Sequence, residues 1–599
     1  MFRTLLAIAA SFTALARADN PFVQTIFTAD PAPVVYNGRV YAFLDHDNTG
    51  ATTYDMTDWR LFSTADMVNW QDHGSPLSLK SFSWAKANAW APQVIARNDK
   101  FYFYVPVQSN TGANAIGVAV SDNILGPYKD ALGKPLVSNS EIDPTVFIDD
   151  DGQAWLYYGN PDLYYIKLNS DMISYSQAPA KISLPSGAGF QEAPWAYKRN
   201  GTYYMIYAGT CCSENIRYMT GPSPTGPFTA RGVIMPTQGK SFTNHEAIID
   251  FQGHSYFFYH NGALPGGSGY QRSACVEEFK YNSDGSIPTI QMTTAGVSQL
   301  GSLNPYLRQE AETAAWTNGA KTEVCSEGGM DVTGISSSSY IKVKGVAFGT
   351  AGASSLAVRV AGTGSGSIAV RLGSTSGTLV GTCSVTSSGG SQTWKTVTCP
   401  ISGAKGTSDL YFVFSGSGYS FNYWQFASAN GSSASAPASS ITTSAATSSA
   451  TGTTTKPATT TTTSAPAQTT SSGVVAARYG QCGGQGWTGP TICQVRYVYS
   501  SKGLDLLADR TFHRVLIRAP CPISTIRNVC RYPLEQTGNC TSDQCSHNME
   551  PPLSLSTKPC LPRVLSCKKP IRSMQRFLRL SKVPNARVFG TRQRFGTIS

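Results

Sequence analysis

The feature that most limits the fold of this chain is a short pattern that occurs five times at nearly equal spacing. Each copy has a pair of turn-forming residues followed by alternating aromatic or other strand-forming residues, which is typical of a tight β-hairpin. The copies begin at Asn37, Asn98, Asp151, Asn200 and Gln252, and their second turn residues lie 61, 53, 49 and 52 positions apart. This period predicts four-stranded propeller blades. We therefore expect an all-β chain in which residues 19–303 form a five-bladed β-propeller, although hairpins of a β-sandwich are the alternative.

The same repeats predict an active site on the propeller axis. Eight or nine residues before the turns, where the innermost strand of each blade should begin, the chain has Asp30, Trp90, Asp143, Glu192 and His245. Convergent carboxylates repel, so one should keep its proton while another stays ionised. Glycoside hydrolysis requires this division between an acid and a base. The alternative is that the Asp-Pro pairs only cap turns, but equivalent positions in three repeats favour a site.

Three acidic segments closely resemble the motifs of glycoside hydrolase family 43. They are residues 29–33 (Ala-Asp-Pro-Ala-Pro), 142–146 (Ile-Asp-Pro-Thr-Val) and 191–195 (Gln-Glu-Ala-Pro-Trp), and the resemblance extends over about residues 20 to 300. It implies an inverting hydrolase that needs no cofactor for its chemistry. Asp30 would then be the general base and Glu192 the general acid, while Asp143 would orient the acid and tune its pKa.

The resemblance also suggests residues that bind substrate or metal. It implies that His245 helps to hold a calcium ion or a water cluster on the axis, whereas a hydrogen-bonded core histidine is the alternative. Arg272 resembles an arginine that reaches the sugar, or else forms an outer ion pair. Trp90 and Trp84 could offer apolar faces to a sugar ring, or could pack in the core. We interpret the remaining nearby acids as solvated or turn residues; they are Asp45, Asp47, Glu246 and residues 149–151.

Residues 304–428 are rich in Gly and Ser with alternating apolar residues, which predicts a jelly-roll-like β-sandwich. Residues 309–312 (Gln-Glu-Ala-Glu) and 421–424 (Phe-Asn-Tyr-Trp) resemble carbohydrate-binding module family 6. The resemblance implies a structural calcium ion near Glu310 and Glu312 and a sugar cleft that includes Asn422. Gly334 stands where many members have a stacking tyrosine, so bracing the propeller is an alternative role. Cys383 and Cys399 flank a hairpin and are expected to form a disulfide.

The C-terminal part changes character twice. Residues 429–477 are almost wholly Ser, Thr, Ala and Pro, which predicts a disordered, O-glycosylated linker. Residues 478–494, beginning near Tyr479, resemble the first half of the fungal cellulose-binding module of family 1, a small disulfide module. Its second half is missing, so we expect weak or lost cellulose binding. The composition of residues 495–599 predicts a disordered tail. Our hypothesis is that this tail comes from a mis-spliced gene model, and a basic partner-binding segment is the alternative.

The charge distribution and the N-terminal segment indicate what the protein binds and where it acts. The tail holds 18 Lys and Arg against 5 Asp and Glu, which leaves 29 against 31 elsewhere, so nucleic-acid binding is not expected. Residues 1–18 predict a secretory signal peptide, and no later segment predicts a membrane span. We expect a secreted monomer.

The main hypothesis for its activity is removal of α-L-arabinofuranosyl or β-xylosyl residues from arabinoxylan or xylan. The sequence does not separate these two sugars, because arabinofuranose and xylopyranose present similar hydroxyl geometry. Endo-arabinanase or exo-galactanase activity on the same fold is the enzymatic alternative. A non-catalytic carbohydrate-binding propeller, in which the three acids only bind sugar, is the alternative of another class.

Overall fold

The computed structural model of the chain describes residues 20–211, 213–237, 239–431, 475–476 and 492–493. Each repeated turn motif joins the first two long strands of a blade, and Asn37, Asn98, Asn200 and Gln252 have the positive φ that such turns require. The turns predicted from the sequence are therefore real hairpins. They divide the first part of the chain into five antiparallel sheets.

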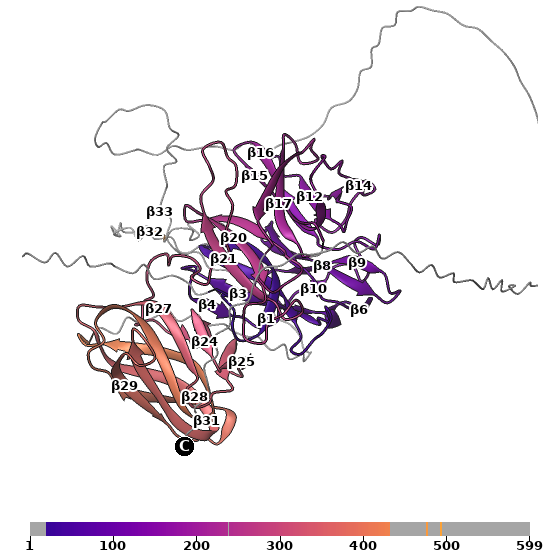
Figure 1. Ribbon diagram of the computed structural model, residues 1–599. Coiled ribbons are helices and arrows are strands. Elements are labelled where there is room, and N and C mark those ends of the chain that lie inside the picture. The colour runs from indigo at the N-terminus through magenta and orange to yellow at the C-terminus, as the bar shows by residue number, and fades with distance from the viewer. Residues whose placement is uncertain (1–19, 212, 238, 432–474, 477–491, 494–599) are drawn as a thin grey trace, which may run out of the picture. The chain divides into compact units, whose positions relative to one another are not determined.

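These five sheets are the blades of the propeller, and they follow one another along the chain (Figure 1). The first contains β1 (Phe27–Tyr36), β2 (Arg39–Asp47), β3 (Asp58–Thr64), β4 (Trp70–Asp72) and β5 (Leu77–Ser78), followed by the 3-10 helix η1 (Leu79–Ser81). The second contains β6 (Ala85–Ala87), β7 (Gln93–Arg97), β8 (Lys100–Ser109), β9 (Asn114–Ser121) and β10 (Lys129–Asp130). The third contains β11 (Thr145–Ile148), β12 (Ala154–Tyr158), β13 (Tyr164–Lys167) and β14 (Ala180–Lys181).

The last two blades complete the ring. The fourth contains β15 (Phe190–Arg199), β16 (Thr202–Gly209), β17 (Asn215–Gly221) and β18 (Thr229–Met235), and the fifth contains β19 (Ala247–Phe251), β20 (His254–Asn261) and β21 (Ser273–Phe279). The start of the described chain borders this three-stranded blade. The Phe22 amide donates to the Ala274 carbonyl, and the Asn20 side chain bonds both backbone groups of Val276. The two ends of the propeller sequence are thereby joined, so the last blade has no free edge on this side.

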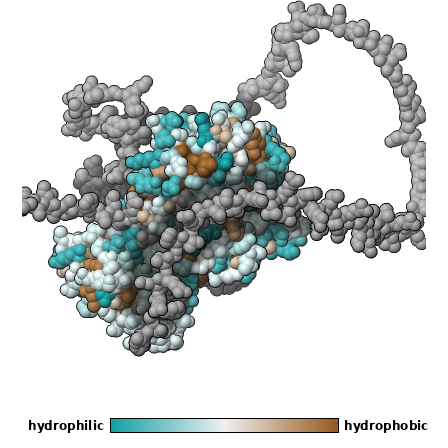
Figure 2. Space-filling model, viewed as in Figure 1, coloured by the Kyte–Doolittle hydropathy of each residue, from teal (hydrophilic) through white to brown (hydrophobic). Residues whose placement is uncertain are grey.

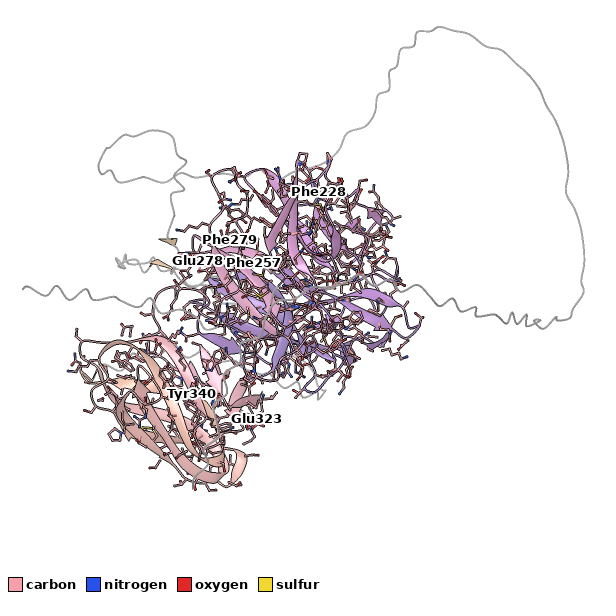
Figure 3. All side chains as sticks on the ribbon, viewed as in Figure 1. Phe228, Phe257, Glu278, Phe279, Glu323 and Tyr340 are labelled. Carbon is pink, nitrogen blue, oxygen red and sulfur yellow. A yellow bond between two sulfur atoms is a disulfide. The ribbon has the colours of Figure 1, made fainter. Side chains whose placement is uncertain are left out.

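Aromatic residues fill the spaces inside the propeller. Phe257 of β20 is fully buried and Phe279 of β21 is nearly so; Figure 3 labels both. Trp59 and Phe103 pack together across the first two blades, with ring centroids 5.8 Å apart. The long inner strands are buried over most of their length, as in β8, β16 and β20, because each blade is covered on both faces by its neighbours.

The second domain is a β-sandwich, as predicted. Its strands are β22 (Gln309–Glu310), β23 (Thr313–Ala314), β24 (Trp316–Asn318), β25 (Lys321–Val324), β26 (Met330–Thr333), β27 (Tyr340–Gly349), β28 (Ala353–Leu372), β29 (Thr378–Val385), β30 (Gly390–Pro400) and β31 (Gly406–Ser428). The long strands β28 and β31 pair along most of their length, with register shifts near Gly362. A Cβ at that position would lie 2.3 Å from a carbonyl oxygen, so the close approach of the two strands requires glycine. The predicted Cys383–Cys399 disulfide is confirmed.

The two domains share backbone and side-chain contacts. Strand β23 pairs with β4 of the first blade, and Thr322 donates to the buried Asp72 carboxylate at 2.7 Å. The side-chain amide of Asn69 donates to the Lys344 carbonyl at 3.0 Å. The β-sandwich is thus bound directly to the propeller, which is compatible with a bracing role for this domain.

A separate unit spans residues 450–599, of which the structure describes only β32 (Val475–Ala476) and β33 (Ile492–Cys493), a short parallel pair. The predicted signal peptide, the basic tail, most of the linker and most of the cellulose-binding segment, with Tyr479, lie outside the described residues.

The coloured part of the surface in Figure 2 is a mixture of hydrophilic and intermediate residues with a few small apolar patches. Large apolar side chains that are exposed include Val324, Leu379 and Phe242. Within the ranges that the structure describes, no helix is long and apolar enough to cross a membrane.

Candidate active site

Irregular backbone places the three predicted acids at the starts of their strands. Asp30 lies in β1 at a register shift between Ala29 and Ala32, and Glu192 lies between two such shifts in β15. Asp30 and Asp143 have φ values of 50° and 59°, a conformation that is strained for residues other than glycine. β-Bulges redirect side chains out of the regular alternation. The strain and the bulges therefore aim these side chains away from the blade surfaces.

The side chains meet at one cavity of about 230 Å³. Its walls come from all five blades, and they include every predicted axial residue together with Arg272. The lining residues are Asp30, Tyr54, Met56, Trp90, Ile142, Asp143, Asn160, Glu192, Thr243, Asn244, His245 and Arg272. The structure thus brings the predicted axial residues together, because strand starts in successive blades face the same axis. Tyr54, Asn160 and Thr243 were missed, since they lie in loops that the repeat does not mark.

Trp84 does not line this cavity. Its indole nitrogen donates to the Asp130 carboxylate at 2.9 Å, and its ring contacts Phe82 at a centroid distance of 5.4 Å. The prediction of a sugar-facing Trp84 is therefore not supported, and packing is its role in this structure. Trp90 does border the cavity, and its indole nitrogen donates to the Tyr54 carbonyl at 2.8 Å, which fixes the orientation of the ring.

Arg272 is the centre of a buried ion cluster. Its Nη1 donates to both oxygens of Asp30 at 3.0 and 3.2 Å, and its Nη2 donates to Asp45 at 3.1 Å and to Asp47 at 2.8 Å. Its Nε also donates to Asp47 at 3.0 Å. The guanidinium is only 2% exposed, yet its planar fork satisfies three carboxylates at once. Arg272 therefore fixes Asp30 in place, whatever contact it also makes with substrate.

Three acids interpreted from the sequence as solvated or turn residues are in fact buried. Asp45, Asp47 and Glu246 are 0%, 1% and 0% exposed. Asp45 and Asp47 contact Arg272, which lies more than 220 positions later in the chain and supplies the opposite charge, but burial and the charge of Asp30 still raise the pKa of Asp45 well above its usual range. Glu246 has no hydrogen-bond partner for either carboxyl oxygen, and burial raises its pKa well above the usual range, which keeps it neutral.

Asp30 is held in its ionised form. Burial alone would raise its pKa, but the Arg272 guanidinium and the contact with His260 outweigh burial and hold the pKa well below its usual range. The Nδ1 atom of His260 lies 3.0 Å from a carboxyl oxygen of Asp30, while its Nε2 lies 2.9 Å from the Thr243 carbonyl. His260 was not predicted, because it lies inside β20, outside the repeated strand starts.

Glu192 is held in its protonated form. Burial raises its pKa to about 7, and the negative charge of Asp30 adds to this rise. Asn160 donates to one Glu192 oxygen through its side-chain amide. The pKa of Asp143 is also raised well above its usual range, by burial and by the charges of Glu192 and Asp30. Asp143 accepts a hydrogen bond from the Ala193 amide at 3.0 Å, so it contacts the backbone immediately after Glu192.

The predicted calcium ligands do not form an ion site in this structure. His245 borders the cavity, and burial lowers its pKa to about 4, so it is neutral. Glu310 is paired with Arg308 at 2.7 Å, and Glu312 has one carboxyl oxygen without a partner. Among the described residues, no three His, Cys, Asp or Glu side chains form a group that could hold a metal. Calcium takes six to eight oxygen ligands, so structural calcium stays a prediction.

Asn422 of the β-sandwich is fully buried. Its amide donates to Glu327 at 3.1 Å, and Glu327 is in turn paired with Arg359. The Asn422 amide nitrogen thus has a partner inside the β-sandwich, whereas its Oδ1 atom has none among the described residues, and a role in a sugar cleft stays a prediction. Gly334 has φ of 64°, so a tyrosine at this position would also be strained.

Comparisons with known proteins agree with this geometry. Residues 18–287 match the family model described as glycosyl hydrolases family 43. The arabinoxylan arabinofuranohydrolase of Bacillus subtilis is 37% identical over 496 residues, which cover 70% of this chain and 95% of that protein. The chain belongs to glycosyl hydrolase family 43. This family 43 member is therefore a glycoside hydrolase, as its sequence predicted.

Other comparisons cover the remaining domains. Residues 310–428 match the carbohydrate binding module of family 6, and residues 478–498 match the fungal cellulose binding domain. An arabinoxylan arabinofuranohydrolase of Paenibacillus polymyxa is 35% identical over 69% of this chain and 75% of that protein. A crystal structure of the Bacillus subtilis family 43 arabinoxylan arabinofuranohydrolase in complex with cellotetraose has a TM-score of 0.62. It is 36% identical, and the match covers 68% of this chain and 97% of that one.

Proposed function

We propose that this family 43 member is a secreted, inverting α-L-arabinofuranosidase that removes arabinofuranosyl branches from arabinoxylan. The observation that carries the proposal is the opposite protonation of two carboxyl groups at one cavity. Arg272 keeps Asp30 ionised, whereas burial raises the pKa of Glu192 to about 7 and so keeps this acid protonated below that pH. A general base and a general acid are thereby available at the same pH.

The reaction follows from these two states. Asp30 removes a proton from a water molecule, whose oxygen forms a bond to the anomeric carbon. The bond from this carbon to the leaving oxygen breaks, and Glu192 donates its proton to that oxygen. Asp30 is then protonated and Glu192 ionised, and exchange of one proton with solvent restores both. Asp143 contacts the backbone next to Glu192, so its role would be to orient the acid.

The cavity favours a single sugar residue at the reacting position. A volume of about 230 Å³ lies below the roughly 300–1,000 Å³ of sites for drug-sized ligands, which suits one pentose ring. Similarity to two arabinoxylan arabinofuranohydrolases supports arabinoxylan as the polymer. A relative from Humicola insolens, 32% identical over 45% of this chain and 98% of its own length, is named xylosidase/arabinosidase. Release of β-xylosyl residues is therefore the second candidate activity.

Product analysis tests both the substrate and the stereochemistry. We expect arabinose from arabinoxylan, little product from linear arabinan, and xylose from linear xylan only if the second activity is present. Proton NMR of the first product from an arabinofuranoside should show the inverted anomer. If the retained anomer were formed first, or if a sugar were trapped covalently on Asp30, the proposed roles would be contradicted.

The same two carboxyl groups predict the pH dependence of kcat/KM. Glu192 must be protonated, so activity should fall as pH rises through about 7. Asp30 must be ionised, and because its pKa is lowered, activity should persist until pH falls below about 4. A bell-shaped profile with these limbs is expected for arabinoxylan. An alkaline limb near pH 4 or 5 would show that Glu192 lacks the raised pKa.

A further inference from the structure

Glu214 is a buried acid beside the active site. It does not lie at one of the repeated strand starts and does not line the cavity. It directly precedes β17, in the same blade as Glu192, and it is 4% exposed. It is absent from the residues that line the cavity, although its carboxyl group shares a hydrogen bond with that of Glu192. Glu192 thus faces the cavity, and Glu214 lies behind it.

The backbone around Glu214 is fixed by the loop that leads to the fifth blade. The Glu214 amide donates to the Phe242 carbonyl at 3.2 Å, and its Oε2 accepts from the Asn244 amide at 2.8 Å. Thr237 donates to the Glu214 carbonyl at 3.0 Å. Two of these contacts hold the Glu214 backbone and one holds its carboxyl group, and none of them involves Glu192.

Two carboxyl groups in hydrogen-bond contact cannot both be ionised without strong repulsion. The charged and titratable groups around this pair are Asp30, Asp143, Glu246 and Arg272. Burial, together with the charge of Glu192, raises the pKa of Glu214 to about 9, above the value of about 7 for Glu192. Since Glu214 has no contact with the cavity, its proton is not in a position to reach a substrate.

We propose that Glu214 is a positioning residue that remains a neutral carboxylic acid and donates a hydrogen bond to Glu192. This inference rests on the proposed function, in which Glu192 loses its proton to the leaving oxygen. The hydrogen bond from Glu214 then stabilises the Glu192 carboxylate that forms. No proton passes from Glu214 to the sugar: the pair holds two protons before the reaction and one after Glu192 has donated, and Glu192 regains its proton from solvent.

Two substitutions separate this role from others. Glu214→Gln keeps a neutral donor of the same length, so kcat on arabinoxylan and the alkaline limb should stay close to wild type. Glu214→Met keeps the length but loses the donor. We expect a decrease in kcat on arabinoxylan of roughly 10- to 100-fold with little change in KM, which is the range for one hydrogen bond to a charged group. The alkaline limb of Glu214→Met should move to higher pH.

Aryl arabinofuranosides with good leaving groups provide the specific readout. They need little protonation, so Glu214→Met should affect them much less than arabinoxylan. An equal loss on both substrates with an unshifted limb would indicate a structural role only and would overturn the inference. A limb that moves to lower pH in both Glu214→Gln and Glu214→Met would show that Glu214 is ionised, which would also overturn it.

Two further variants complete the design. Glu277→Gln alters another buried glutamate, bound by Thr293 and Tyr259 and outside the cavity walls, and so controls for the general effect of such a change. Glu192→Gln separates the two hypotheses. If Glu192→Gln remains active on arabinoxylan, the proposed function itself fails. If it is inactive while Glu214→Met behaves as wild type, only the inference about Glu214 fails.

Discussion

Glu192→Gln is expected to lower kcat on arabinoxylan by roughly 10²- to 10⁴-fold, the range that a general acid contributes. The sugar oxygen that leaves is a poor leaving group, and glutamine has no proton of suitable acidity to donate. The amide keeps the size of the carboxyl group and, like the protonated acid, is neutral in a site that already repels negative charge. The fold should therefore be retained, which thermal unfolding would check. Nearly normal release of arabinose by the folded variant would remove Glu192 from the acid role.

Asp30→Asn should give the opposite dependence on the leaving group. A better leaving group does not replace a missing base, so activity should be lost on arabinoxylan and on aryl arabinofuranosides alike. Added azide is a nucleophile that needs no base, and it should restore turnover with an inverted glycosyl azide as product. Glu277→Gln, which changes a buried acid outside the cavity, serves as the control for both variants. A retained azide product would contradict the inverting mechanism.

The sequence predicted the propeller and the axial residues because both depend on local, repeated chemistry. A two-residue turn followed by a strand has the same pattern wherever it occurs, and a constant interval converts five such turns into five blades. The strand starts then follow by counting. Asp30, Asp143 and Glu192 could therefore be placed at one site although they come from three different blades.

The environment of these acids could not be predicted in the same way. Whether Asp45 and Asp47 are solvated or buried depends on Arg272, and no local pattern connects positions so far apart in the chain. Charged residues are assigned to the surface by default because an unpaired buried charge is so unfavourable. That assignment fails where a distant partner neutralises them. Glu214 and His260 were missed for the same reason, since their contacts come from other strands and loops.

Aromatic residues near the site show a related limit. Trp84 and Trp90 are only six positions apart and each is followed by alanine, yet Trp90 borders the cavity and Trp84 bonds to Asp130. Which face of a loop a ring occupies is decided by the strands that pack against it. Asn422 of the β-sandwich is similar, because only the structure shows that its side chain is buried and bonded to Glu327.

Arg272→Met should destabilise the propeller more strongly than replacement of either Glu192 or Glu214. Removing the guanidinium leaves Asp30, Asp45 and Asp47 buried without a cation, and breaking a buried ion pair from one side costs about 3–5 kcal/mol. Arg272→Lys should recover only part of this loss, because an ammonium has three donors on one atom, whereas the guanidinium makes five contacts to carboxyl oxygens from three separate nitrogens. Thermal and urea unfolding would measure the change.

The pH dependence of this destabilisation identifies its cause. In the wild type, the lowered pKa of Asp30 contributes stability above about pH 4 that is lost as pH falls through the folded-state value. Without Arg272, burial is opposed mainly by His260, so the pKa of Asp30 should be higher than in the wild type, and the cost of ionising Asp30 should grow as pH rises. The difference between Arg272→Met and wild type should consequently be larger at pH 7 than at pH 4. Arg359→Met, which breaks the partly exposed pair with Glu327 in the β-sandwich, should cost about 1 kcal/mol or less. If Arg272→Met lowered the free energy of unfolding equally at both pH values, lost packing rather than lost charge pairing would explain the destabilisation.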